Sequence, residues 1–217
     1  MTDSRKFSVA PFAIAVIAMA SVVVASNYLV QFPVEGMLGG VNLADLLTWG
    51  AFTYPAAFLV TDLTNRRFGP KAARIVVLVG FFLAVGLSVW LATPRIAIAS
   101  GSAFLLAQLL DVTVFNRLRQ GQWWKAPIVS SMLGSVLDTV LFFGLAFSAL
   151  ASGALGYHDD FAVEAAPLFG AFALEVPRWI SWALGDFAVK ALVSLAMLLP
   201  YRVALSVQGL MPNNSAA

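Results

Sequence analysis

Two aspartates lie within long apolar stretches of this sequence, where an isolated charge is costly. Asp111 belongs to IAIASGSAFLLAQLLDVTVF and Asp138 to PIVSSMLGSVLDTVLFFGLAF, and neither stretch contains a cation. A run of about 20 apolar residues spans a bilayer as a helix, and an aspartate at its centre costs about 2.5–3.5 kcal/mol on insertion. We therefore predict that both carboxylates line a polar cavity inside a helical bundle.

The neighbours of these aspartates favour a binding surface. Phe104 and Gln108 precede Asp111 by seven and three residues, so the three side chains share one face of a helix. Gly134 precedes Asp138 by four residues, and a small residue there lets a neighbouring helix or a flat ligand approach closely. A structural role for Gln108, as a hydrogen-bonding bridge between helices, stays open.

A second pair of charges lies near the end of the sequence. Asp186 and Lys190 are four residues apart in WISWALGDFAVKALVSLAMLLP and share one helix face. Either they neutralise each other within their own helix, or Lys190 faces Asp138 or a bound solute across the cavity. We expect the second arrangement, because the cavity already holds two carboxylates that need a nearby cation.

Three more candidates lie in the first two apolar stretches. Asn27 is near the outer end of the first, and Pro55 interrupts the second next to Tyr54. Proline removes a backbone hydrogen bond from a helix, and Tyr54 adds an aromatic face with a hydroxyl. Asp62 follows at the inner end of the second stretch. Asn27 also fits an interhelical bridge and Asp62 a polar helix end at the membrane surface, so both alternatives stay open.

The composition is that of a membrane protein. Of 217 residues, 60% are hydrophobic and 11% are charged, with a mean hydropathy of +0.87, whereas soluble domains carry about 25% charged residues. The absence of cysteine excludes disulfides and thiol chemistry, and the single His158 excludes a multi-histidine metal site. A net charge of +2 gives no indication of nucleic-acid binding. We expect no metal, no cofactor and no nucleic-acid partner.

The apolar stretches predict an all-α integral membrane protein, a bundle of six transmembrane helices that forms one domain, residues 1–217. The expected bounds are about 12–31, 46–61, 73–92, 96–115, 127–150 and 179–203. The long connection 151–178 is half apolar, and whether it contains an interfacial helix stays open.

The basic residues predict the orientation of this bundle. The even connections and the two termini hold ten of the thirteen Lys and Arg: Arg5, Lys6, Arg66, Arg67, Lys71, Arg74, Arg117, Arg119, Lys125 and Arg202. The odd connections hold Arg95 and Arg178. Because cytoplasmic connections carry the excess of positive charge, we expect both termini in the cytoplasm.

Catalysis is not indicated. Asp111 and Asp138 imitate the facing pair of an intramembrane aspartyl protease, yet neither stands in the Tyr-Asp or Gly-x-Gly-Asp context of those enzymes. Nothing resembles a nucleophile elbow, a P-loop or a metal cluster. Carboxylates, amides and aromatic rings without a nucleophile are typical of a solute carrier, so we expect no enzyme.

Several motifs resemble those of a known family. SNYLVQFPV, TWGAFTYPAAFLVTDLTNRRFG, RIAIAS, QLLDVTVFNRLRQ, WWKAP and DFAVKALVSLAMLLP are similar to the bacterial queuosine-precursor transporters, a branch of the vitamin-uptake-like transporter family. The resemblance implies inward transport of 7-cyano-7-deazaguanine and its 7-aminomethyl relative across the bacterial inner membrane. It also singles out Asn27, Asp62, Gln108, Asp111, Asp138 and Lys190.

The residue chemistry agrees with such a 7-deazapurine substrate. The expected partners are this small molecule and the lipid bilayer that surrounds the helices. A guanine-like edge presents two adjacent N–H donors to one carboxylate, and its ring stacks on an aromatic such as Tyr54 or Phe104. Its O6 needs a donor, which Gln108, Asn27 or Lys190 supplies. The alternative function is a substrate-capture subunit of a multi-component importer of vitamins or purine-like compounds. The sequence leaves open the energy coupling, the preferred precursor and any homo-oligomer.

Overall fold

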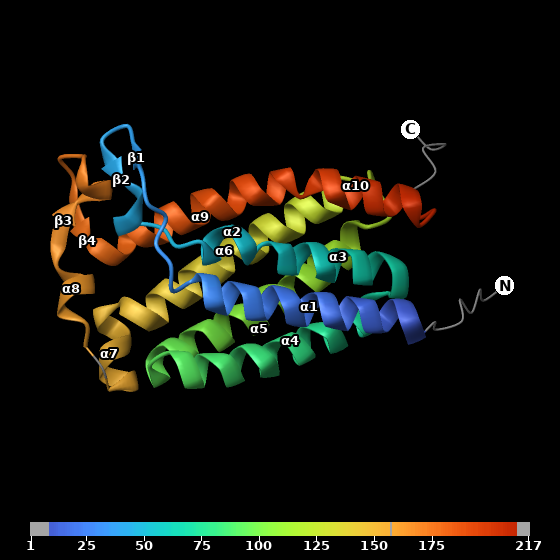
Figure 1. Ribbon diagram of the computed structural model, residues 1–217, viewed down its shortest axis with the longest axis horizontal. Coiled ribbons are helices and arrows are strands. Elements are labelled where there is room, and N and C mark those ends of the chain that lie inside the picture. The colour runs from blue at the N-terminus through green and yellow to red at the C-terminus, as the bar shows by residue number, and fades with distance from the viewer. Residues whose placement is uncertain (1–8, 157, 212–217) are drawn as a thin grey trace.

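Long helices run side by side along the longest dimension of the molecule (Figure 1). The computed structural model describes residues 9–156 and 158–211. The helices are α1 (Val9–Leu29), α2 (Gly50–Thr53), α3 (Ala56–Phe68), α4 (Pro70–Leu91), α5 (Pro94–Leu118), α6 (Lys125–Phe147), α7 (Ala149–Leu155), α8 (Asp160–Val163), α9 (Arg178–Ala196) and α10 (Leu198–Val207).

Within these ranges, five helical stretches are long and apolar enough to cross a membrane: α1, α4, α5, α6, and α9 continued by α10. They confirm a predominantly α-helical, multi-pass membrane protein. The predicted stretch 46–61 is divided, because α2 ends at Thr53 and α3 begins at Ala56, after Pro55. Proline lacks the N–H that a continuous helix would use there. A sixth span through α2 and α3 therefore stays a prediction.

The last span also contains a break, at Met197, between α9 and α10. Pro200 follows three residues later and has no N–H to donate to the carbonyl of Ala196, so the regular ladder is interrupted at this point. The apolar pattern predicted one continuous helix over 179–203, so this break was not expected.

Small residues bring the helices into close contact. A Cβ atom added to Gly134 of α6 would lie 2.7 Å from Cε1 of Phe58 in α3, and one added to Gly80 of α4 would lie 2.8 Å from Cγ of Met19 in α1. Glycine at such positions lets backbones approach closely. The main apolar core is made of Met19, Val23, Ala57, Ala73, Val76, Val77, Ala84, Phe104 and Val112.

The two ends of the bundle differ. At the basic end α1 begins, α10 ends (Figure 1), and α3 and α5 are connected to α4 and α6. It is named for the cations there, Arg66, Arg67, Lys71, Arg74, Arg117, Arg119, Lys125 and Arg202. Arg5 and Lys6 lie outside the described residues.

The opposite, hairpin end carries two short antiparallel hairpins (Figure 1). β1 (Met37–Leu38) pairs with β2 (Val41–Asn42), and β3 (Ala165–Pro167) pairs with β4 (Glu175–Pro177). The connection 151–178, which the sequence left undecided, thus contains the end of α7, then α8 and a hairpin rather than one interfacial helix.

Arg95, counted above as a loop cation, is buried at the hairpin end. Its Nε donates to the carbonyl of Leu145 and its Nη2 to the carbonyl of Ser148, both at 2.8 Å. These carbonyls lie at the C-terminus of α6, where a cation complements the helix dipole. Arg95 therefore has a structural role at a helix end.

Candidate functional site

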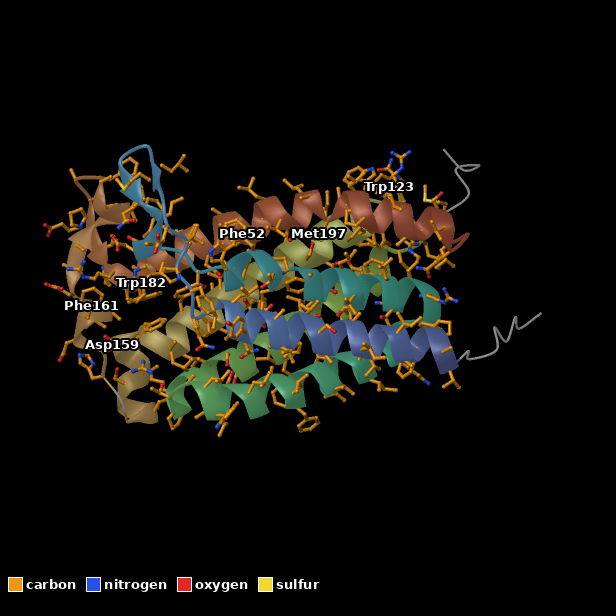
Figure 2. All side chains as sticks on the ribbon, viewed as in Figure 1. Phe52, Trp123, Asp159, Phe161, Trp182 and Met197 are labelled. Carbon is orange, nitrogen blue, oxygen red and sulfur yellow. The ribbon has the colours of Figure 1, made fainter. Side chains whose placement is uncertain are left out.

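A cavity of about 430 Å³ lies between α1, α2, α4, α5, α6 and α9, within the half of the bundle nearer the hairpin end. Its lining includes Asp45 and Thr48 from the connection before α2, and Trp182 from the first turns of α9. Figure 2 shows Trp182 near Phe161 of α8, at the hairpin end, and Trp123 at the opposite end. The volume is that of a small-molecule site.

Three charged side chains meet on one wall of this cavity. Nζ of Lys190 in α9 lies 2.6 Å from Oδ2 of Asp138 in α6 and 2.5 Å from Oδ2 of Asp186 one turn away. Thr139 donates to Asp186 at 3.2 Å, and Lys190 also lies 5.4 Å from the ring centroid of Tyr54. Lys190 thus makes both contacts that the sequence presented as alternatives. The two carboxylates and one ammonium leave this group with one excess negative charge when all are ionised.

A chain of small polar groups lies on the opposite wall. Ser88 of α4 donates to Oδ1 of Asn27 at 3.3 Å and lies 3.1 Å from the hydroxyl of Ser100 in α5. The side-chain Nδ2 of Asn27 donates to the backbone carbonyl of Val23 at 2.9 Å. Asn27 therefore bridges helices and also lines the cavity, so its two expected roles are compatible.

Aromatic rings complete the lining. Tyr54 and Phe104 meet edge to face at 5.9 Å, and Phe147 meets Trp182 at 5.3 Å. Phe142 also lines the cavity. Phe142, Phe147 and Trp182 were not among the residues expected at the site. Helical spacing would have indicated two of them, because Phe142 follows Asp138 by four residues and Trp182 precedes Asp186 by four.

The structure divides the candidate residues into two groups. Six of them line the cavity: Asn27, Tyr54, Phe104, Asp138, Asp186 and Lys190. The remaining three, Asp62, Gln108 and Asp111, are absent from that lining and lie closer to the basic end. Asp111 and Asp138 therefore belong to different sites, although the sequence placed them in one cavity.

The second group is a buried polar cluster between α3, α5 and α6. The hydroxyl of Thr61 donates to Oε1 of Gln108 at 2.7 Å. The carboxyl groups of Asp62 and Asp111 interact with each other, and Ser130 of α6 lies 3.5 Å from Oδ1 of Asp62. Asp62 is 2% exposed and Asp111 is 0% exposed. Among the described residues, neither oxygen of Asp111 has a hydrogen bond of good geometry.

Hydrogen bonds to backbone carbonyls tie the helices together at the basic end. Arg66 of α3 donates to the carbonyl of Arg119 and, through Nε at 3.1 Å, to the hydroxyl of Tyr201 in α10. Arg119 donates to the carbonyl of Asn65 and Asn65 to that of Val112, both at 3.0 Å. We call these five residues the basic-end latch. It joins α3, the C-terminal part of α5 and α10 at the basic end of the bundle.

Apolar spanning helices around a cavity that holds buried charged side chains define a multi-pass membrane protein of the solute-carrier class. Comparison identifies the family. The model of the family described as "Putative vitamin uptake transporter" matches residues 48–93 and 86–204, and the chain belongs to this family. This membership indicates a transporter rather than an enzyme.

Curated relatives have a more specific name. The chain is 37% identical to the queuosine precursor transporter of Escherichia coli (strain K12), over 86% of this chain and 82% of the relative. It is 35% identical to the "Probable queuosine precursor transporter" of Haemophilus influenzae, over 86% and 83%. A protein of Bacillus subtilis with the same name is 25% identical over 77% and 74%. No solved structure matches the chain significantly.

Proposed function

We propose that this protein moves queuosine precursors, 7-cyano-7-deazaguanine and 7-aminomethyl-7-deazaguanine, inward across a bacterial inner membrane. The names of its relatives support the substrate class. The observation that carries the proposal is the group of Asp138, Asp186 and Lys190, which meets aromatic rings in one cavity. The whole chain, 1–217, acts as one transport unit in this proposal.

The charged group suits a guanine-like edge. A carboxylate accepts two adjacent N–H donors, which the N1–H and the exocyclic amine of the base provide. Because Lys190 contacts two carboxylates, Asp138 can accept the base while Asp186 holds the ammonium in place. Lys190 is then positioned to donate to O6. A site with such buried groups rejects analogues that leave them unpaired.

The aromatic lining suits a flat ring system. Tyr54, Phe104 and Phe142 line the cavity, and stacking of a flat ring on one aromatic face adds about 0.5–1.5 kcal/mol to area burial. The excess negative charge of the charged group, Asp138, Asp186 and Lys190, also favours a substrate with a cationic substituent. We therefore infer that the aminomethyl precursor binds at least as tightly as the cyano precursor.

The proposed orientation places both termini in the cytoplasm, with α2 and α3 together completing a sixth crossing. The cations of the basic end support it, because positive charge accumulates on the cytoplasmic side. The cavity lies nearer the hairpin end, so substrate enters it from outside the cell. The latch at the basic end then separates the cavity from the cytoplasm.

Uptake in cells that cannot make queuosine precursors tests the proposal, with queuosine in their tRNA as the readout. The chain expressed alone should restore queuosine when either precursor is supplied, and Asp138→Asn should not. Asp160→Asn, which changes a carboxylate outside the cavity, is the matched control and should retain uptake. Restoration only together with a separate ATP-driven module would favour the capture-subunit alternative.

A further inference from the structure

Asp62 and Asp111 form a pair of carboxyl groups that the substrate cavity does not use. We propose that this pair is the proton-binding site that couples transport to a proton gradient, one proton accompanying each substrate molecule inward. The inference rests on the transport function proposed above and adds its source of energy.

The burial of both carboxyl groups favours a shared proton. Two ionised carboxylates in contact repel each other strongly where water is excluded, and such pairs hold one proton between them. Asp62 and Asp111 are both buried, and they come from different helices, α3 and α5. Their contact therefore holds these two helices together while the proton is bound and opposes their packing once it is lost.

The surroundings offer the two carboxyl groups one nearby cation, which is shared with the basic-end latch. Among the described residues, the charged or titratable groups that face the pair are Arg66 of α3 and Tyr201 of α10. Arg66 is engaged by the carbonyl of Arg119 and the hydroxyl of Tyr201. Ser130 of α6 contributes only a hydroxyl. Lys190 of α9 already contacts two carboxylates in the cavity.

A separate small cavity touches Asp62 of the pair. Its volume is about 10 Å³, and its lining includes Asp62, Ser194 of α9 and Tyr201. The hydroxyl of Ser194 is buried and has no hydrogen-bond partner among the described residues. Space of this size next to unsatisfied polar groups is suited to about one water molecule. It gives Asp62 a polar neighbour through which a proton can pass toward the basic end.

The proton follows a balanced cycle. A carboxyl O–H bond forms at the pair with a proton from the outer side, while the latch is closed and the cavity is open at the hairpin end. When the latch opens, that O–H bond breaks, the proton passes to water on the cytoplasmic side, and Arg66 compensates the second negative charge. A new proton from outside must be bound before α3 and α5 can pack together again.

Purified protein in liposomes tests the inference, with labelled 7-cyano-7-deazaguanine and an entrapped pH indicator. With one proton per substrate, an acidic outside should drive about tenfold accumulation per pH unit, together with acidification of the interior. A protonophore should abolish both. A sodium gradient alone should drive nothing, and accumulation with sodium would overturn the proposal.

The variant Asp111→Asn separates coupling from binding. It should exchange labelled for unlabelled substrate yet neither accumulate it nor acidify the interior, and its exchange should lose dependence on pH. Asp62→Asn should give the same result as Asp111→Asn, so the test does not depend on the correct folding of a single variant. Asp160→Asn should retain accumulation. If the wild type exchanges substrate but its accumulation does not depend on the pH gradient, only the coupling site is refuted. If the wild type shows no exchange at all, the transport function itself is refuted.

Discussion

Replacing Lys190 by methionine removes the cation that two buried carboxylates share. In the structure Lys190 lies 2.6 Å from Asp138 and 2.5 Å from Asp186, and both Lys190 and Asp138 are at least 95% buried. Removing one partner of a buried ion pair costs about 3–5 kcal/mol. At about 2–4 °C per kcal/mol for a chain of this size, the midpoint of thermal unfolding should fall by about 6–20 °C.

Two further variants separate stability from function. Adding Asp186→Asn to Lys190→Met leaves one unpaired carboxylate instead of two, so part of the lost stability should return while uptake stays absent. Asp186→Asn alone keeps the pair of Lys190 with Asp138 and should reduce uptake by about threefold or less, since one hydrogen-bonded acceptor is exchanged for another.

Thermal unfolding in detergent and uptake at matched protein level measure these effects. A fully active double variant, Asp186→Asn with Lys190→Met, would refute the role assigned to Lys190 and reduce the pair to mutual neutralisation within α9. An unchanged unfolding midpoint for Lys190→Met would refute the buried arrangement itself.

Three other predictions address the orientation, the packing and the latch. Because the chain has no cysteine, Gly121→Cys should be shielded from an impermeant thiol reagent in intact cells and Asp159→Cys should be labelled; the reverse pattern contradicts the orientation. Gly134→Ala should lower the free energy of unfolding by about 1–3 kcal/mol through overpacking against Phe58, and an unchanged chemical-denaturation midpoint would count against it. Tyr201→Phe removes an acceptor from Arg66 and should cost about 0.5–1.5 kcal/mol, with faster hydrogen exchange in α10 than in α6; equal exchange would contradict a latch.

Patterns of local chemistry predicted much of this molecule. Apolar length gave the long helices, and Pro55 marked the division between α2 and α3, because both depend on properties of adjacent residues. The contact between Asp138 and Lys190 was also expected, since a buried charge needs a partner. The separation of Asp111 from Asp138 was not expected. It depends on how far along the bundle each carboxylate lies: Asp111 lies seven residues before the end of α5 and Asp138 thirteen residues after the start of α6. The helical rise per residue would have indicated this difference in depth.

The break at Met197 divides the last span into two separate helices, α9 and α10, which act as two stiff rods. Lys190 lies on the first rod, in the cavity wall, and Tyr201 lies on the second, at the basic end. A continuous helix would carry any tilt from one end to the other, whereas a helix bends most easily where its ladder of hydrogen bonds is interrupted. The last span therefore bends most easily at Met197. Such a bend lets α10 move away from Arg66 while the charged side chains of α9 keep their contacts with α6.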